Sequence, residues 1–410
     1  MNDLSNHAHP MANSAPKLTG GWAAVGSVAA GTFLLVTAEF LPIGLLSRLA
    51  HDLHVSEGTA GLAVTAAGFV AAFAGPGLVL LAGRIDRRKI VVGLTAAIIV
   101  SNLIAVVAPT FPLFLLGRLL LGFAVGGLWS FAGAVVRRLV ADDAGGRATS
   151  FISAGIGAGT VWGMPAGALI GGWFGWRAAF AVNVALGVVI LFAQLRLLPR
   201  LAVASKIDAS HLVAFARVPM ARAGLIAAGF VAGGHFVAYT YLEPWLRGAL
   251  RLEQAGVAWT LCAYAVAGVV GTFLGERLAA RDVRHAFIMI ALVLGGSVLA
   301  AAAASISLPT AITLVLIWGI AFGAMPVCVQ IWMFNSSPRL YEAGSALMVS
   351  AFQIPLAAGA AIGGAIVDRA GLDAAFATGG AITLIGAAIL IVFRRASADA
   401  DHRCLADATS

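Results

Sequence analysis

Apolar runs of about twenty residues recur along this whole chain, and this feature constrains its fold more than any other. An α-helix rises 1.5 Å per residue, so a run of about twenty residues matches the thickness of a bilayer's hydrocarbon core. The chain is 60% hydrophobic and only 11% charged, whereas soluble domains carry about 25% charged residues. The sequence therefore predicts an all-α membrane protein that crosses the bilayer many times.

Twelve spans are expected. They are 22–46, 58–82, 90–108, 113–136, 149–172, 177–198, 221–246, 255–275, 286–304, 310–334, 344–367 and 375–393. The polar segments between them divide the chain. We expect an N-terminal tail at 1–20, a six-helix bundle at 21–198, a central loop at 199–220, a second six-helix bundle at 221–393 and a C-terminal tail at 394–410. The two predicted bundles contain related segments, because "AGALIGG" at 166–172 recurs as "AGAAIGG" at 358–364. Such duplication is typical of transporters whose site lies between two repeats.

Basic residues are distributed asymmetrically about these spans. With both termini inside, 20 of the 26 Lys and Arg residues fall in cytoplasmic segments and 5 in outer loops, and Arg118 lies within a span. The positive-inside rule predicts this orientation, with both tails in the cytoplasm of a bacterial inner membrane. The net charge of +8 thus reflects topology rather than nucleic-acid binding. The three cysteines are too few and too scattered for a disulfide framework or a metal site.

The fifth predicted span carries a glycine at every fourth position from Gly155 to Gly171, with Pro165 among them. One ridge of small residues lets a neighbouring helix approach closely, and a proline bends a helix. One interpretation is tight packing alone. The other is that Gly159, Gly163, Pro165 and Gly167 lie where the two bundles move against each other.

Several motifs resemble those of a known family. They are "GRIDRRK" (83–89), "LLGRLLLGFAVGG" (115–127) and "GTVWGMPAGALIGG" (159–172). Over essentially its whole length the chain resembles the major facilitator superfamily, and within it the twelve-span drug:H+ antiporters. The stretches 39–61, 239–246 and 317–327 are similar to the bacterial purine-nucleoside efflux pumps, relatives of the arabinose and chloramphenicol exporters. The resemblance implies a gating role for Gly83, Asp86, Arg87 and Arg88 in the loop after the second span.

Glu39 is a carboxylate inside the first predicted span, and Arg118 lies at a similar depth in the fourth. Burial favours a protonated carboxyl group, whereas a nearby guanidinium favours the carboxylate, so movement between such environments moves a proton. The resemblance likewise implies a coupling role for both residues. The alternative is a permanent ion pair that braces two helices.

His235, Tyr239 and Glu243 follow one another at intervals of four in the seventh predicted span, so one continuous helix would place them on one face. This face is a candidate to bind a polar ligand, with His235 also a candidate proton relay. The alternative for His235 is a structural hydrogen bond between helices.

A nucleoside needs flat apolar surfaces for its base and neutral donors and acceptors for its polar groups. Residues of the right types inside the predicted spans include Phe40, Asn102, Trp129 and Gln353.

The sequence thus predicts a proton-coupled exporter of a small polar or amphipathic molecule that works by alternating access, with a purine nucleoside as the favoured substrate. It is expected to be a monomer. Because the sequence contains no nucleotide-binding loop, it is expected to use the proton-motive force without a cofactor. Because it contains no catalytic triad or metal set, it is not expected to be an enzyme. A sugar or drug exporter, a proton-independent facilitator or importer, and a nontransporting membrane receptor remain alternatives.

Overall fold

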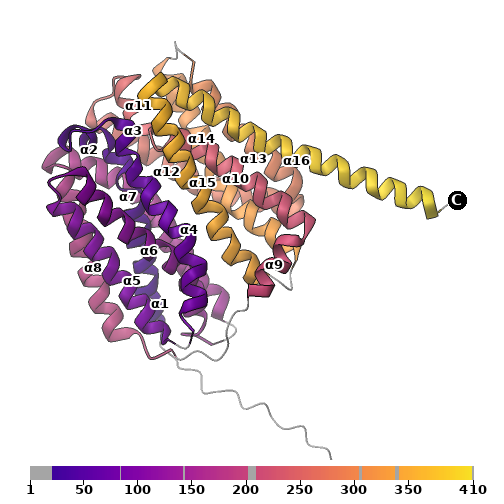
Figure 1. Ribbon diagram of the computed structural model, residues 1–410, viewed down its shortest axis with the longest axis horizontal. Coiled ribbons are helices and arrows are strands. Elements are labelled where there is room, and N and C mark those ends of the chain that lie inside the picture. Colours follow the sequence, from indigo (N-terminus) through magenta and orange to yellow (C-terminus); the bar gives the residue numbers. More distant parts are fainter. Residues whose placement is uncertain are drawn as a thin grey trace, which may run out of the picture.

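The computed structural model describes residues 21–83, 85–141, 144–201, 209–303, 307–337 and 341–408, and within these ranges it is helical with no strand (Figure 1). The longer helices are α1 (Gly21–Phe40), α4 (Leu62–Leu81), α5 (Arg87–Val107), α6 (Phe111–Arg137), α7 (Gly145–Phe174), α8 (Trp176–Leu197), α10 (Pro219–Tyr239), α12 (Gln254–Arg281), α13 (Val283–Ala301), α14 (Leu308–Ser336), α15 (Tyr341–Ala370) and α16 (Leu372–Ala408). The shorter ones are η1 (Ile43–Leu45), α2 (Leu46–Asp52), α3 (Glu57–Ala60), α9 (Ala209–Arg217) and α11 (Leu242–Gly248). The predicted all-α fold is confirmed.

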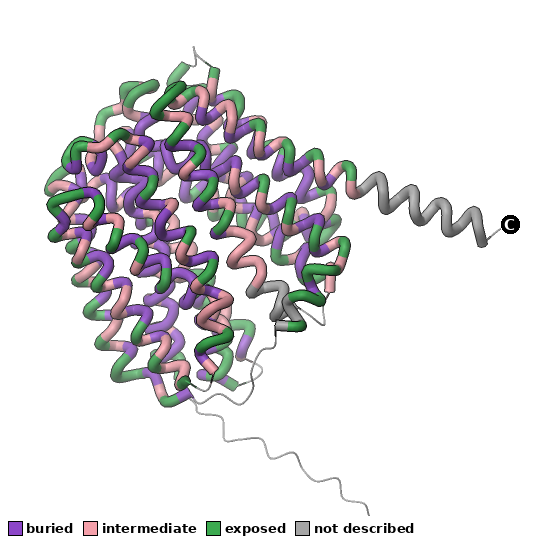
Figure 2. Tube along the Cα trace, viewed as in Figure 1, coloured by how far each residue is buried: buried purple, intermediate pink, exposed green. Residues whose placement is uncertain are grey.

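Within the described residues, eleven helical segments are long and apolar enough to span a membrane. Of the twelve predicted spans, the exception is α7, which is 30 residues long but rich in glycine, a residue that adds little hydropathy. Large apolar side chains such as Phe69, Phe73 and Phe192 are exposed on the outer surface, as expected for lipid contact. Figure 2 shows the buried positions gathered inside the bundle.

Two expected spans are each broken near one end. α1 ends at Phe40, and the chain continues through a turn, η1 and α2, whereas one helix over 22–46 was expected. α10 ends at Tyr239, and α11 begins only at Leu242. A proline follows each break. Pro42 comes two residues after Phe40, and Pro244 lies in the first turn of α11. Proline lacks an N–H group and disfavours helix just before it, so both breaks have a local cause.

Three predicted boundary segments fall partly outside the described ranges. The predicted tail at 1–20 lies wholly outside them, as do residues 202–208 of the predicted central loop. The rest of that loop contains α9. α16 continues as helix to Ala408, so most of the predicted C-terminal tail is helical.

The helices pack as two groups. The first group comprises α1–α8 with η1, and the second comprises α10–α16. The glycine ridge of α7 packs inside the first group. A Cβ added at Gly155 or Gly159 would collide with α1 near Ala29 and Phe33. The ridge therefore brings α7 onto α1, which matches tight packing rather than a sliding surface between the groups.

At the end of the molecule formed by α2, α3 and α11, the two groups are joined by several hydrogen bonds (Figure 1). The carboxylate of Asp368 in α15 accepts from Ser56 Oγ at 2.7 Å and from Gly58 N at 3.0 Å, and Ser47 N donates to Glu243 Oε2 at 3.1 Å. Further hydrogen bonds join the groups between the level of Ala72 and this end. We call it the closed end.

Candidate functional site

Glu39 is the next-to-last residue of α1, where the helix breaks before Pro42. Its side chain is buried, with 3% of the residue exposed. Gln353 Nε2, on α15 of the second group, donates to Glu39 Oε1 at 3.0 Å. Trp129 on α6 also lies near this carboxyl group. The structure thus places a membrane-embedded carboxyl group at the boundary between the two groups, where their relative movement would change its surroundings.

Arg118 on α6 is also fully buried, and all its hydrogen bonds in the structure go to main-chain oxygens. Its Nε donates to Ala63 O at 2.9 Å, its Nη1 to Ala38 O at 2.8 Å and its Nη2 to Glu39 O at 2.9 Å. A permanent ion pair of Arg118 with the Glu39 carboxylate, one of the two interpretations of the sequence, is therefore absent between these two described side chains. Instead the guanidinium joins the end of α1 to α4 and adds positive charge near Glu39.

His235 on α10 is fully buried in a set of aromatic rings. Its ring stacks on Phe322 with centroids 3.6 Å apart and lies 4.6 Å from the ring of Tyr239. Trp318 Nε1 donates to His235 Nδ1 at 2.9 Å. Because an indole N–H only donates, Nδ1 must be unprotonated, so the ring is neutral and carries its proton on Nε2. That Nε2 is buried without a partner, which leaves one unused donor.

The aromatic rings continue across the boundary between the groups. Phe40, beside Glu39, stacks on Phe236 at 6.3 Å and meets Tyr239 edge-on at 6.4 Å. Tyr239 Oη donates to Met164 Sδ at 3.7 Å. The ring centroids of Tyr239 and Tyr264 are 5.3 Å apart.

Several buried polar atoms near these rings have no partner: Thr37 Oγ1, His235 Nε2, Tyr264 Oη and Gln353 Oε1. Buried polar groups are normally hydrogen-bonded, so a group of unpaired ones on facing elements indicates a site for a polar ligand or water. We call Glu39, Phe40, Trp129, His235, Tyr239, Tyr264, Trp318, Phe322 and Gln353 the central cluster.

Two predicted binding residues lie elsewhere. Asn102 on α5 donates to Ile98 O of its own helix at 2.8 Å and makes no recorded contact with the central cluster. Glu243 lies on α11 beyond the helix break, so its expected place on one face with His235 is wrong. Its carboxylate forms an ion pair with Arg247 at 2.8 Å and belongs to the closed end.

The predicted gating loop is held within the first group. Gly83 has a φ of 42°, which glycine adopts without strain. Asp86 caps α5, because its Oδ1 accepts from Arg88 N and from Leu201 N, each at 2.9 Å. Arg88 Nη2 donates to Leu195 O at 2.6 Å, and Arg87 lies over the ring of Phe131. These contacts tie the loop to α6 and to the end of α8.

Sequence reasoning missed Trp318, Phe322 and Tyr264. Aromatic residues inside spans face lipid or pack in the core more often than they bind ligand, so composition gave no reason to select these three. Trp318 and Phe322 do lie in the stretch 317–327, which resembles the nucleoside efflux pumps, and that resemblance was the signal that could have found them. Tyr264 lies outside the resembling stretches, on α12.

The chain's family follows from a match to the family model described as Major Facilitator Superfamily, over residues 28–360 and 224–405. The chain belongs to this superfamily. It is therefore a multi-pass membrane protein of the transporter type, and the predicted resemblance is confirmed.

Individual relatives carry different names. The chain is 32% identical over 403 residues to the "Transcription regulatory protein OpdE" of Pseudomonas aeruginosa, covering 97% of this chain and 100% of the relative. It is 31% identical over 369 residues to the "Purine ribonucleoside efflux pump NepI" of Salmonella typhimurium, covering 90% of this chain and 93% of the relative.

Solved structures agree in fold. A bacterial homologue of the lysosomal transporter Spinster, titled inward-facing and occupied, superposes with a TM-score of 0.71 at 16% identity, over 90% of this chain and 96% of the other. The human organic anion transporter MFSD10 superposes with a TM-score of 0.66 at 16% identity, over 90% of this chain and 99% of the other.

Proposed function

We propose that this protein exports a purine nucleoside, or a closely similar small polar molecule, in exchange for protons. The observation that carries the proposal is the buried Glu39 carboxyl group, which hydrogen-bonds Gln353 of the opposite group and lies beside the aromatic rings of the central cluster. The similarity to purine ribonucleoside efflux pumps supports the choice of substrate.

Proton coupling would follow from the position of Glu39. When the groups separate at the closed end, Gln353 moves away and water replaces it, while Arg118 stays with α1 through its main-chain bonds. The two states therefore offer the carboxyl group different partners and different hydration, which changes its proton affinity within one cycle. The membrane potential supplies about 2.3 kcal/mol per charge per 100 mV, which is roughly 40-fold accumulation for one proton.

Substrate binding would use the neutral half of the central cluster. Tyr239, Phe322 and Phe40 offer flat surfaces for a purine ring, and His235 Nε2 and Tyr264 Oη offer unused donors for its ring nitrogens or carbonyl oxygen. Protonating His235 on Nδ1 would break its bond from Trp318, so we assign His235 first to binding and only second to the proton path that the sequence suggested.

The orientation proposed from the basic residues places the closed end outside the cell. The structure then corresponds to a state that opens toward the cytoplasm, with both termini inside. Asp368, Glu243 and Tyr241 would act as the outer gate, since each bonds across or beside the boundary between the groups there.

The test is efflux of radiolabelled inosine from liposomes that contain the purified protein, with and without an imposed pH gradient. We expect the gradient to drive flux by the wild type and to lose its effect in Glu39→Gln. The control is Glu276→Gln, which removes an exposed carboxylate from α12 and should leave the coupling intact. Equal flux with and without the gradient in all three proteins would refute proton exchange and leave a facilitator. If labelled arabinose or chloramphenicol is moved but inosine is not, the substrate assignment is wrong.

A second candidate function is a membrane receptor without transport, because a relative of similar identity is named as a transcription regulatory protein. The same liposomes distinguish the two candidates. Absence of flux for all three labelled compounds, combined with saturable binding of one of them to the purified protein, would favour the receptor.

A further inference from the structure

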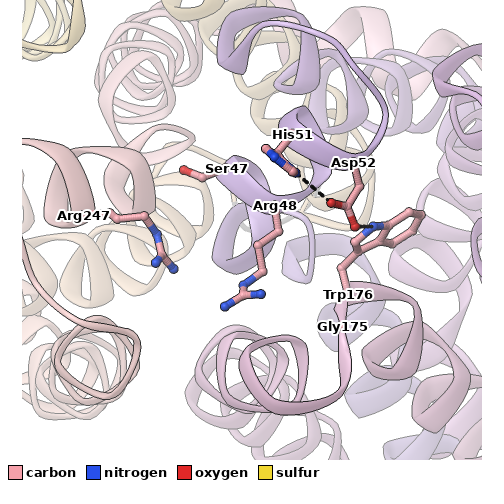
Figure 3. Close-up of a pocket in the computed structure, with 7 residues that line it drawn as sticks. All are labelled: Ser47, Arg48, His51, Asp52, Gly175, Trp176 and Arg247. Carbon is pink, nitrogen blue, oxygen red and sulfur yellow. Dashed lines mark hydrogen bonds and ion pairs between the residues drawn. The ribbon is translucent and has the colours of Figure 1, made fainter.

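A cavity lies outside the central cluster, at the closed end between the two groups of helices (Figure 3). Its volume is about 370 Å³, and its lining residues are Ser47, Arg48, His51, Asp52, Gly175, Trp176 and Arg247. In Figure 3 the side chains of Arg48 and Arg247 extend toward the same space from opposite sides. Arg48 comes from α2 and Arg247 from α11, so the cavity is assembled from both groups.

The two guanidinium groups converge on one neutral atom. Gln254 Oε1 accepts from Arg48 Nη2 at 3.0 Å and from Arg247 Nη2 at 2.7 Å. The other end of this amide is fixed, because Gln254 Nε2 donates to Ala168 O. Two cations held on a single amide oxygen repel each other, and a neutral acceptor does not balance their charge.

Only one of the two cations has its own counter-ion. Arg247 Nε donates to Glu243 Oε1 at 2.8 Å, within an ion pair. Arg48 has no carboxylate within ion-pair distance among the described residues, and its Nε is buried without an acceptor. A buried, unpaired guanidinium N–H is costly, so this atom is a donor available to an anionic group.

The acidic residue that lines the cavity is already occupied. Asp52 Oδ2 accepts from Trp176 Nε1 at 3.0 Å, and Asp52 Oδ1 lies 3.0 Å from His51 Nδ1. The hydrogen bond from His51 is the main cause that holds the pKa of the Asp52 carboxyl group below its usual range. Its charge is thus committed to these partners at one side of the cavity, and the excess positive charge stays at Arg48.

We propose that this cavity binds a phosphate-type oxyanion between Arg48 and Arg247. A guanidinium presents a planar fork of donors that matches oxyanions, and the unused Arg48 Nε supplies one arm of it. The volume is at the lower end of small-molecule sites and leaves room for either a free phosphate or the phosphate of a lipid headgroup.

Anion binding would depend on the conformation of the protein. Since Arg48 and Arg247 belong to different groups, the bound anion contacts both groups only while this end is closed. The anion therefore stabilises the closed end, and an increase in its concentration should slow the opening step.

The first measurement is isothermal titration calorimetry of inorganic phosphate into delipidated protein in a neutral detergent. We expect saturable binding by the wild type and binding at least about tenfold weaker by Arg48→Gln, which keeps a polar side chain but loses the charged fork. Arg251→Gln is the matched control, because Arg251 is an exposed arginine that follows α11 and does not line the cavity, and it should bind like the wild type. Arg48→Lys serves if the Gln variant does not fold, and it should also bind more weakly because it lacks the fork.

The second measurement identifies the source of the phosphate group. Native mass spectrometry of protein taken from bilayers with phosphatidylglycerol should show retained lipid in the wild type and its loss in Arg48→Gln if the headgroup is the ligand. Binding of free phosphate with no such lipid difference assigns the site to a soluble anion. If neither phosphate binding nor lipid retention changes with Arg48, the proposal is wrong.

Discussion

The closed end depends on a glycine whose replacement should open it. Gly58 lies in α3 of the first group, and the main chain of α15 approaches it closely. A Cβ added at Gly58 would lie 2.5 Å from the Asp368 carboxyl group and still closer to Gly364 O, whereas ordinary contacts begin at 3.4 Å. All the atoms in its way belong to the second group, so the collision exists only while this end is closed.

The magnitude follows from this geometry. Relieving a shortfall of this size requires a shift of the main chain, and overpacking of this kind costs about 1–3 kcal/mol. Because the cost falls on one state, Gly58→Ala should shift the equilibrium toward the open state by about 5- to 150-fold. The control is Gly157→Ala in α7, where an added Cβ meets nothing within 4 Å.

The assay is double electron–electron resonance between spin labels at Thr110 and Glu253, in a background without native cysteines. Both positions are exposed next to helix ends at the closed end, one in each group. We expect a longer distance to appear in Gly58→Ala, and the short distance alone in Gly157→Ala. An unchanged distribution in Gly58→Ala would refute the argument that this backbone contact controls the closed end.

Three further predictions rest on single contacts. Arg118→Ala should greatly reduce the amount of folded protein, measured by size-exclusion chromatography, because three main-chain oxygens lose their donors at about 1–3 kcal/mol each. Trp318→Phe should raise the KM for exported nucleoside by about tenfold with a smaller change in kcat, since His235 loses the bond that fixes its tautomer; an unchanged KM would contradict the binding role. Asp282→Ala should destabilise α13 by about 1 kcal/mol, because the carboxylate caps the helix by accepting hydrogen bonds from Arg284 N and His285 N. The drop in Tm measures this loss of stability. These bonds lower the pKa of the Asp282 carboxyl group, so its contribution is complete above its ordinary pKa of 3.8 and is lost as the pH falls below that value; an equal Tm difference at all pH values would contradict this cause.

Prediction from the sequence succeeded for the helices and most span boundaries, because these follow from the composition of each segment. Apolar runs fix helices in a bilayer because every main-chain polar group must be bonded within its own segment, so the helical fold and most of the span boundaries are local properties. The spacing of glycines on α7 likewise predicts close packing, and the structure supplies α1 as the partner.

Prediction from the sequence failed where a residue's role depends on distant elements. Glu243 was expected beside His235, but the break after Tyr239 separates them, and hydropathy does not register a short break that keeps the segment apolar. Arg118 and Glu39 were expected at similar depth, which is compatible with the structure, yet depth does not reveal that the guanidinium bonds main-chain oxygens.

By itself, the sequence determined that this chain is a helical membrane protein of a transporter superfamily, because hydropathy and motifs act within single helices. Only the tertiary structure decided that Glu39 bonds Gln353, that Trp318 holds His235 neutral with a free Nε2, and that two arginines from opposite groups share Gln254. Apart from the bond between Arg247 and Gln254, which are seven positions apart, each of these contacts joins residues more than eighty positions apart. Their distances depend on how whole helices pack, and no local pattern in the chain encodes that arrangement.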